Sequence, residues 1–365
     1  VLASQEEGTN ELSNFAEHFK NFISEPTFTG QKTKTNGLTN TTSVTTSLGT
    51  IIGTQQNGFR SFKGVPFAQP PLDNLRWESP VPVSPWNGEL SATEFPFACP
   101  QVQKAVNGTP FITTGMSEDC LYLNIWAPLQ SDLPNNKKVP VMVWFHGGSF
   151  WTGWGGDGLF WGDYLVNSTS DTIIVTTNYR LGALGFFATP NLPGNYGFQD
   201  QQMALQWVQD HISDFGGDPS RVTIFGQSAG AMSVTLHTIS PSSVGLFSRA
   251  IAESNPAGIN YRTPEESYPY SQKVSGLLGC DYLDLNCLRS KTWQEIVDVQ
   301  LKGYIVEFPI RTTEFLPYSP IIDGSIIPEQ PMKLFREGKV NSNIEAMAFG
   351  VNRNESMAMF PVYIP

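Results

Sequence analysis

The chain has 365 residues, of which 40% are hydrophobic and 12% aromatic, which suffices for one large α/β domain or two ordinary ones. Lys and Arg number 22 against 33 Asp and Glu, so the net charge is −11. This charge repels phosphate backbones and anionic membranes and argues against nucleic acid as a partner. No apolar run approaches the roughly 18 residues of a membrane span, so no transmembrane segment is expected.

Residues 1–44 differ from the remainder of the chain. Apolar side chains at helical spacing between Asn10 and Ser24 predict a short amphipathic helix, and residues 25–43 are rich in Thr, Asn and Gly. The first residues lack the basic head and apolar middle of a signal peptide, which is consistent with a mature form whose signal has been removed. We therefore predict a polar leader over 1–44, with its helix docked on the domain surface in preference to a membrane or partner-binding role.

Strand and helix signals alternate through residues 45–365, and no internal repeat or second boundary interrupts them. Apolar runs at Val139–Phe145 and Thr172–Thr177 are typical of strands buried on both faces of a largely parallel sheet. Leu121–Trp126 is a further predicted strand, and Phe198–Phe215 reads as a helix. The alternation predicts one α/β domain over 45–365.

Gly226–Gly230 forms a Gly-x-Ser-x-Gly motif between four β-favouring residues and a run compatible with a helix. Strand, tight turn and helix in this order are the context of a nucleophile elbow. The turn would lift the Ser228 hydroxyl out of the sheet, and small residues would be needed at Gly226 and Gly230. A glycine-rich structural turn is the alternative, and the flanking elements favour the nucleophile.

A second small-residue turn, His146 to Ser149, closes the apolar strand at Val139–Phe145. Consecutive backbone N–H groups in such a turn, at the carboxyl end of a strand, can bind an anionic oxygen. An ordinary connection between strand and helix is an equally good interpretation of this segment alone.

The four cysteines show no Cys-x-x-Cys spacing and no neighbouring histidine pairs, so neither a metal site nor a cofactor is expected. Two local pairs remain, Cys99 with Cys120 and Cys280 with Cys287. Asn40, Asn107 and Asn167 each open an Asn-x-Ser/Thr triplet for N-glycosylation. Together these features favour a secreted or luminal glycoprotein in an oxidising setting.

From about residue 45 the chain resembles the carboxylesterase/cholinesterase family of α/β-hydrolases. The motifs that carry the resemblance are ordered along some 300 residues: Phe62–Pro71, Ser117–Asn124, His146–Gly148, Asn178–Gly182, Gly194–Gln201, Phe215–Pro219, Gly226–Gly230 and Gly350–Asn352. The resemblance implies the α/β-hydrolase fold, a central mostly parallel sheet flanked by helices, with the C-terminal part of the fold missing from this chain.

The resemblance also implies roles for individual residues. Ser228 would be the nucleophile and Glu355 the acid of a catalytic triad. The oxyanion hole would comprise Gly147, Gly148, Ser149 and Ala229, with backbone N–H donors from the last three. Further implications are the disulfides Cys99–Cys120 and Cys280–Cys287 and structural ion pairs of Arg76 with Glu118 and Arg180 with Asp200.

Departures from the family pattern narrow the expected substrate. Ser149 stands where members usually carry a third glycine, and its side chain would narrow the oxyanion hole. Gln227 replaces the glutamate of cholinesterases, and the loop from Cys99 to Cys120 has no tryptophan to hold a quaternary ammonium group. A choline ester is therefore not the expected substrate. Glu355 also lies in an Asn-Glu-Ser triplet, which we interpret as fortuitous.

The base of the triad is missing. In the family it is a histidine well beyond the acid, whereas this sequence ends at Pro365. His18 lies in the leader, His146 beside the oxyanion turn and His211 near the end of a helix. His237 is nine residues beyond Ser228, about 13 Å along a helix. None of the four is suited to be the base.

Two hypotheses follow. In the first, the protein is a secreted serine carboxylic-ester hydrolase that acts on a small-molecule ester through an acyl-enzyme on Ser228. Its histidine comes from a missing or separate C-terminal segment, expected as a second polypeptide packed non-covalently on the apolar residues 356–365. In the second, the protein is an inactive relative with a binding, adhesion or structural assembly role. The natural ester and the oligomeric state are left open.

Overall fold

The computed structural model describes residues 40–56, 58–102, 105–106, 109–110, 112–133, 137–300, 302, 316–353 and 355. The chain divides into Val1–Thr39 and Asn40–Pro365, and the description concerns the second unit. The helix predicted between Asn10 and Ser24 lies outside the described residues. Among the described residues the first strand begins at Asn40, so the predicted boundary between residues 44 and 45 falls inside this strand.

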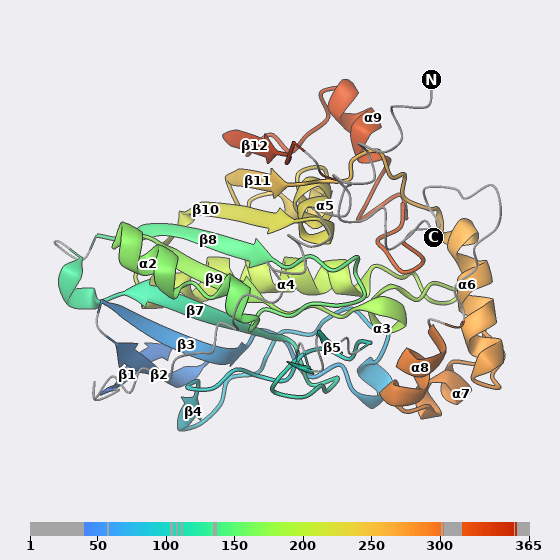
Figure 1. Cartoon of the computed structure of the whole chain (residues 1–365), viewed down its shortest axis with the longest axis horizontal. Coiled ribbons are helices and arrows are strands. Elements are labelled where there is room, and N and C mark those ends of the chain that lie inside the picture. The colour runs from blue at the N-terminus through green and yellow to red at the C-terminus, as the bar shows by residue number, and fades with distance from the viewer. Residues whose placement is uncertain are drawn as a thin grey trace, which may run out of the picture. The chain divides into compact units, whose positions relative to one another are not determined.

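One mixed sheet runs through the described residues in the order β1-β2-β3-β7-β9-β8-β10-β11-β12, with β4 paired to β2 (Figure 1). Strands β9, β8, β10, β11 and β12 are parallel, whereas β1, β2, β3 and β7 pair antiparallel. The bounds are β1 Asn40–Thr46, β2 Gly49–Gln56, β3 Phe59–Pro66, β4 Glu89–Ser91, β7 Tyr122–Pro128, β8 Val139–Phe145, β9 Ile173–Thr177, β10 Gly217–Gln227, β11 Arg249–Glu253 and β12 Ala346–Gly350. A separate pair consists of β5 Ala105–Val106 and β6 Thr109–Pro110.

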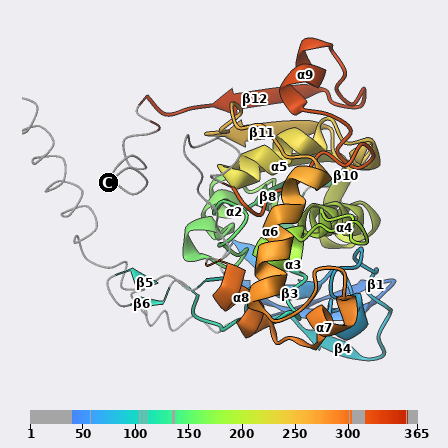
Figure 2. The ribbon, with the colours of Figure 1, turned by 90° about the vertical axis from the view of Figure 1, so that its right-hand side faces the viewer.

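Helices flank this sheet, and Figure 2 shows α6, α7 and α8 grouped at one end of it. The α-helices are α2 Asp163–Thr169, α3 Gly182–Phe186, α4 Tyr196–His211, α5 Ala229–His237, α6 Pro264–Leu277, α7 Leu285–Ser290, α8 Trp293–Gln300 and α9 Pro331–Arg336. The 3₁₀ turns are η1 Asp73–Leu75, η2 Gln130–Asp132, η4 Gly158–Phe160, η5 Ile212–Phe215 and η6 Pro241–Ser243.

The apolar runs of the sequence form the centre of the sheet. All five residues of β9 are buried, and β8 is buried on both faces over its last three residues. Strands covered on both faces have no need of polar alternation, which explains the unbroken apolar pattern. The strand predictions at these positions are confirmed, and the mixed, helix-flanked sheet is an α/β-hydrolase fold.

The helix predicted over Phe198–Phe215 is divided in two. It runs as α4 to His211 and then as the 3₁₀ turn η5 to Phe215. Gly216 follows with φ of 97°, a left-handed conformation that ends helices. The side chains of Leu205, Val208 and Ile212 are buried against the sheet as expected from their spacing.

Both predicted disulfides are present, Cys99–Cys120 and Cys280–Cys287. The predicted ion pairs are also present and buried. Arg180 donates from Nε and Nη2 to the two carboxylate oxygens of Asp200, at 2.8 and 2.7 Å. Its backbone N–H donates to the same carboxylate at 3.0 Å.

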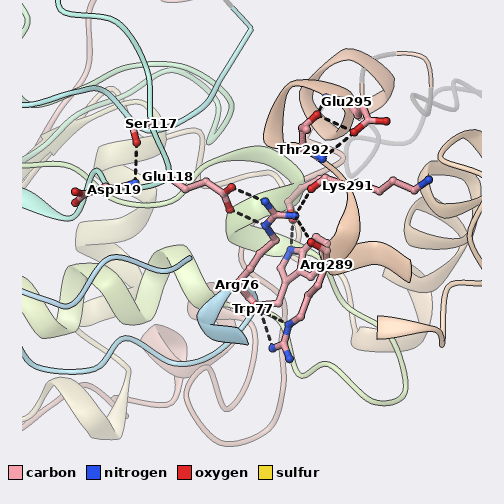
Figure 3. Close-up of polar contacts among 10 residues, drawn as sticks. Arg76, Trp77, Ser117, Glu118, Asp119, Arg289, Lys291, Thr292 and Glu295 are labelled. Atoms are coloured by element: carbon pink, nitrogen blue, oxygen red, sulfur yellow. Dashed lines mark hydrogen bonds and ion pairs between the residues drawn. The ribbon is translucent and has the colours of Figure 1, made fainter. Parts of the chain in front are cut away.

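Arg76 joins three segments of the chain (Figure 3). Its guanidinium forms a two-pronged pair with Glu118 and also donates to the backbone carbonyls of Arg289 and Lys291. Arg289 in turn donates from Nε and Nη2 to the carbonyl of Arg76, at 3.0 and 2.8 Å. The end of the Cys99–Cys120 loop is thereby attached to the connection between α7 and α8.

Candidate active site

Ser228 lies between β10 and α5, in the order of strand, turn and helix that its motif predicts. Its φ of 57° and ψ of −119° are strained for a residue with a side chain. Its backbone N–H donates to the Glu253 carbonyl at 3.0 Å and its carbonyl accepts from Met232 N–H at 2.9 Å. The side chain is partly exposed, and its hydroxyl makes no hydrogen bond with the described residues.

The two glycines of the motif are required by close approach of backbone atoms. A Cβ on Gly226 would lie 2.7 Å from the Phe145 carbonyl oxygen, and a Cβ on Gly230 only 2.0 Å from that oxygen. Real Cβ atoms essentially never approach within 3.0 Å. The elbow therefore packs directly on the last residue of β8.

The predicted oxyanion turn lies against this elbow. Strands β8 and β10 are parallel with Phe145 opposite Gly226, so both turns emerge at the same edge of the sheet. A Cβ on Gly147 would lie 3.3 Å from the Ser228 Cβ. Gly148 and Ser149 have φ of 109° and 57°, and within the described part of the chain their N–H groups have no acceptor.

Ala229 is the first residue of α5 and is buried beside Ser228. The N–H groups of the first helical turn have no partner within a helix. The helix N-terminus also carries partial positive charge. Together with the turn at Gly148 and Ser149, this arrangement can stabilise an oxygen that becomes negative next to Ser228.

Glu355 lies on the same edge, two strands from the serine. Gln227, Glu253 and Gly350 occupy one row across β10, β11 and β12, and each precedes a turn. The Glu355 carboxylate is exposed and accepts the Asn352 N–H at 2.7 Å. A hydrogen bond from the Ser254 hydroxyl, followed by that N–H, lowers the pKa of the Glu355 carboxyl below its usual value.

Ser254 is a residue of the site that the sequence did not single out. It follows β11 in a left-handed conformation with φ of 51°, and its N–H donates to the Gly350 carbonyl at 2.7 Å. Because its hydroxyl bonds Glu355 and its neighbour Glu253 binds the Ser228 N–H, it stands between the predicted nucleophile and acid. A serine after a strand is too common to be recognised without the register of β11.

The described histidines are placed as structural residues. His146 is fully buried, stacks on Tyr179 at a ring distance of 4.3 Å and donates from Nδ1 to the Gly147 carbonyl at 2.9 Å. His237 is fully buried between Phe145 and Phe198, bonded to Ser243 and Gln201. Burial lowers the pKa of His146 to about 4 and that of His237 to about 3.

His211 does not reach the site either. His211 ends α4, which leads through η5 to the amino end of β10, the edge of the sheet opposite Ser228. Its pKa is lowered by partial burial. His18 lies outside the described residues.

The two buried histidines predict an acid-sensitive fold. Their folded pKa values lie below the ordinary 6.5, so protons bind the unfolded chain preferentially between pH 6.5 and about 4. As the pH is lowered through this window, we expect the free energy of unfolding to decrease by up to about 1.4 kcal/mol per pH unit for each histidine. Urea unfolding at several pH values measures this slope, and a stability that stays constant or rises from pH 6.5 to 5 would contradict it.

The predicted glycosylation acceptors fall on the surface where they can be described. Asn40 opens β1 and Asn167 lies in α2, and both are exposed. Asn107 and Asn354 lie outside the described residues. In the part of the chain that the structure describes, no helix is long and apolar enough to cross a membrane, and no cluster of side chains suited to a metal ion occurs.

Comparisons with known proteins identify relatives of this chain. The model of the carboxylesterase family matches residues 40–365. The chain is 41% identical to a crystal protein of Dictyostelium discoideum over 80% of its length and 52% of that protein's. It is 38% identical to an acetylcholinesterase of Electrophorus electricus over 88% of its length and 52% of that protein's.

Two further relatives are a carboxylesterase 5A of Canis lupus familiaris and a solved structure. The first is 40% identical over 82% of this chain and 52% of its own length. The solved structure, of a PNB esterase, is 35% identical with a TM-score of 0.77 and covers 87% of this chain and 65% of its own. The chain spans about half the length of the curated relatives it matches, and it belongs to the carboxylesterase family.

Proposed function

We propose that this chain carries the nucleophile of a secreted serine carboxylic-ester hydrolase. The observation that carries the proposal is the contact between two turns, the strained elbow at Ser228 and the Gly147–Ser149 turn with its unengaged N–H groups. A nucleophile with backbone donors beside it is what acyl transfer requires. Family membership, with cholinesterases and carboxylesterases among the relatives, supports the same chemistry.

In this proposal Ser228 Oγ attacks the carbonyl carbon of a small-molecule ester. The hydroxyl proton passes to a histidine, and the carbonyl oxygen becomes an anion held by the N–H groups of Gly148, Ser149 and Ala229. The alcohol leaves with that proton, and water then hydrolyses the acyl-serine. Glu355 orients and stabilises the protonated histidine, a role that suits a carboxylate whose pKa is lowered.

The histidine of this scheme is proposed to come from a missing or separate C-terminal segment. Among the described histidines, His146 and His237 are buried in structural contacts and His211 lies at the opposite edge of the sheet, and the curated relatives are about twice as long as the matched region. Strand β12 pairs only with β11 among the described residues, and Phe349 and Val351 are 59% and 76% exposed at its end. All four cysteines are in disulfides, so a separate segment would associate non-covalently.

The substrate is proposed to be a neutral ester in preference to a choline ester. Gln227 is exposed next to Ser228, where it offers an amide and no negative charge to a cationic substrate. The Cys99–Cys120 loop supplies no tryptophan for a cation–π contact.

A fluorophosphonate probe tests the proposal, because only an activated serine displaces its fluoride quickly. Protein that contains this C-terminal segment should be labelled at Ser228, identified by peptide mass, and Ser228→Ala should abolish labelling. Ser233→Ala, in the following helix, is the matched control and should retain it. If the segment is a separate polypeptide, the native mass should exceed the mass measured in denaturant without reductant.

The alternative function is a non-catalytic binding, adhesion or assembly role. The observation in its favour is that the described histidines are buried structural groups or lie at the opposite edge of the sheet. One relative is named a crystal protein, a name that states no activity. Absence of labelling in protein that contains the C-terminal segment would replace the esterase proposal with this one.

A further inference from the structure

The fold brings two glycosylation acceptors to one corner of the sheet. Asn40 is the first residue of β1 and lies opposite Gln55 of β2. Gln55 comes just before the turn that joins β2 to β3. In that same turn, a Cβ on Gly58 would lie 2.5 Å from the side-chain oxygen of Asn167. Two triplets that are far apart in the sequence therefore lie near the same turn.

Both acceptors have the chemistry that the modification needs. Asn40 and Asn167 are exposed, and each is followed two positions later by a threonine, Thr42 and Thr169. The amide oxygen of Asn167 faces the Gly58 turn, whereas its amide nitrogen lies beyond 4 Å from the same point. The nitrogen, which would carry the sugar, is thus turned away from the packed side.

Exposed apolar side chains of α2 lie beside one of these acceptors, Asn167. Tyr164 in α2 is 79% exposed and lies one helical turn before Asn167, on the same face of the helix. Leu165, also in α2, is 41% exposed. Strand β1 is an edge strand that pairs only with β2 among the described residues. Exposed edges and apolar patches promote association between chains.

We propose that N-linked glycans on Asn40 and Asn167 together cover this corner and keep β1 and α2 from associating with other chains. The amide nitrogen of each asparagine displaces the diphosphate from the anomeric carbon of a lipid-linked oligosaccharide. An N–C bond forms, one amide proton is released, and the lipid diphosphate leaves. The proposal rests on the secretory setting of the proposed function and is independent of catalysis.

The corner is remote from Ser228. Helix α2 leads directly into the amino end of β9, whereas Ser228 lies at the carboxyl edge of the parallel strands. In Figure 1, β1 and β2 lie at the left and the arrowheads of β8 and β10 point to the right. Glycans here would leave the candidate active site open.

Site occupancy is the first test, on protein secreted from a eukaryotic host. Thr42→Ala and Thr169→Ala should each remove one glycan by intact mass, whereas Thr42→Ser and Thr169→Ser should retain it. Asn191→Gln changes an exposed asparagine outside any acceptor triplet and should leave the mass of the glycans unchanged. Absence of a glycan at either Asn40 or Asn167 in the unmodified sequence would overturn the proposal.

Association is the second test. Analytical ultracentrifugation should show concentration-dependent self-association of Thr42→Ala/Thr169→Ala, with Tyr164→Ser in that background reducing it. A doubly unglycosylated protein that sediments as the glycosylated one does would overturn the covering role. Fluorophosphonate labelling of Ser228 should be the same in all these variants, so loss of the glycans and failure of the esterase proposal are distinguishable.

Discussion

Replacing Gly230 by alanine is expected to slow fluorophosphonate labelling of Ser228 by about 100-fold. The new Cβ would lie 2.0 Å from the Phe145 carbonyl oxygen, so the elbow or the end of β8 must shift by about 1 Å. Displacement of that size in a catalytic constellation costs about two orders of magnitude in rate. Overpacking against backbone atoms should also lower the free energy of unfolding by about 3 kcal/mol. Labelling kinetics and urea unfolding measure the two effects.

Gly276 provides the matched control. It lies in α6, and a Cβ there would meet nothing within 4 Å. Gly276→Ala should therefore raise stability by about 0.5–1 kcal/mol, because alanine is the better helix former. Gly230→Ala that labels at the wild-type rate would show that the elbow does not depend on this contact.

Replacing Asp200 by alanine is expected to lower the free energy of unfolding by about 3–5 kcal/mol. The carboxylate receives three hydrogen bonds from Arg180, and both side chains are buried, with 4% and 0% exposure. Removing it leaves a guanidinium out of water with no counter-charge, which costs more than the pair itself contributes. Chemical denaturation of wild type and variant gives the difference.

Two further variants test whether the loss in Asp200→Ala comes from the unpaired buried charge. Arg180→Met combined with Asp200→Leu removes both charges and should recover part of the loss. Glu345→Ala breaks the exposed pair with Arg249 and should change stability by less than about 1 kcal/mol. Equal losses for Asp200→Ala and Glu345→Ala would mean that burial does not govern these pairs.

The centre of the fold could be predicted from local pattern because its strands are covered on both faces. The apolar runs at β8 and β9 indicate that burial directly. Strand β1 could not be predicted in this way, because Asn40–Thr46 is mostly polar. It is held by backbone hydrogen bonds with β2, and these do not depend on the side chains. The apolar periodicity also did not indicate the end of α4. The 3₁₀ turn η5 that follows still buries its apolar side chains, so the pattern continues although the α-helix has ended.

Part of the candidate site could likewise be predicted from local sequence, and part could not. Ser228 and the turn at Gly147–Ser149 are set by contiguous residues, so short motifs indicate them. Ser254 reaches Glu355 only because β11 lies between β10 and β12 in register, which no local pattern encodes. Glu355 itself was placed by family resemblance, and its link to Ser254 emerges only in three dimensions.

The exchange of hydrogen bonds between Arg76 and Arg289 has a consequence for how the molecule opens. Each guanidinium donates to the backbone carbonyl of the other residue. If either segment detaches, the guanidinium of the other segment therefore loses a hydrogen-bond acceptor. Glu118 adds a counter-charge that would lose its partner in the same event. The α7–α8 connection and the segment around Arg76 therefore form one unit of local unfolding, although 213 positions separate them in the sequence.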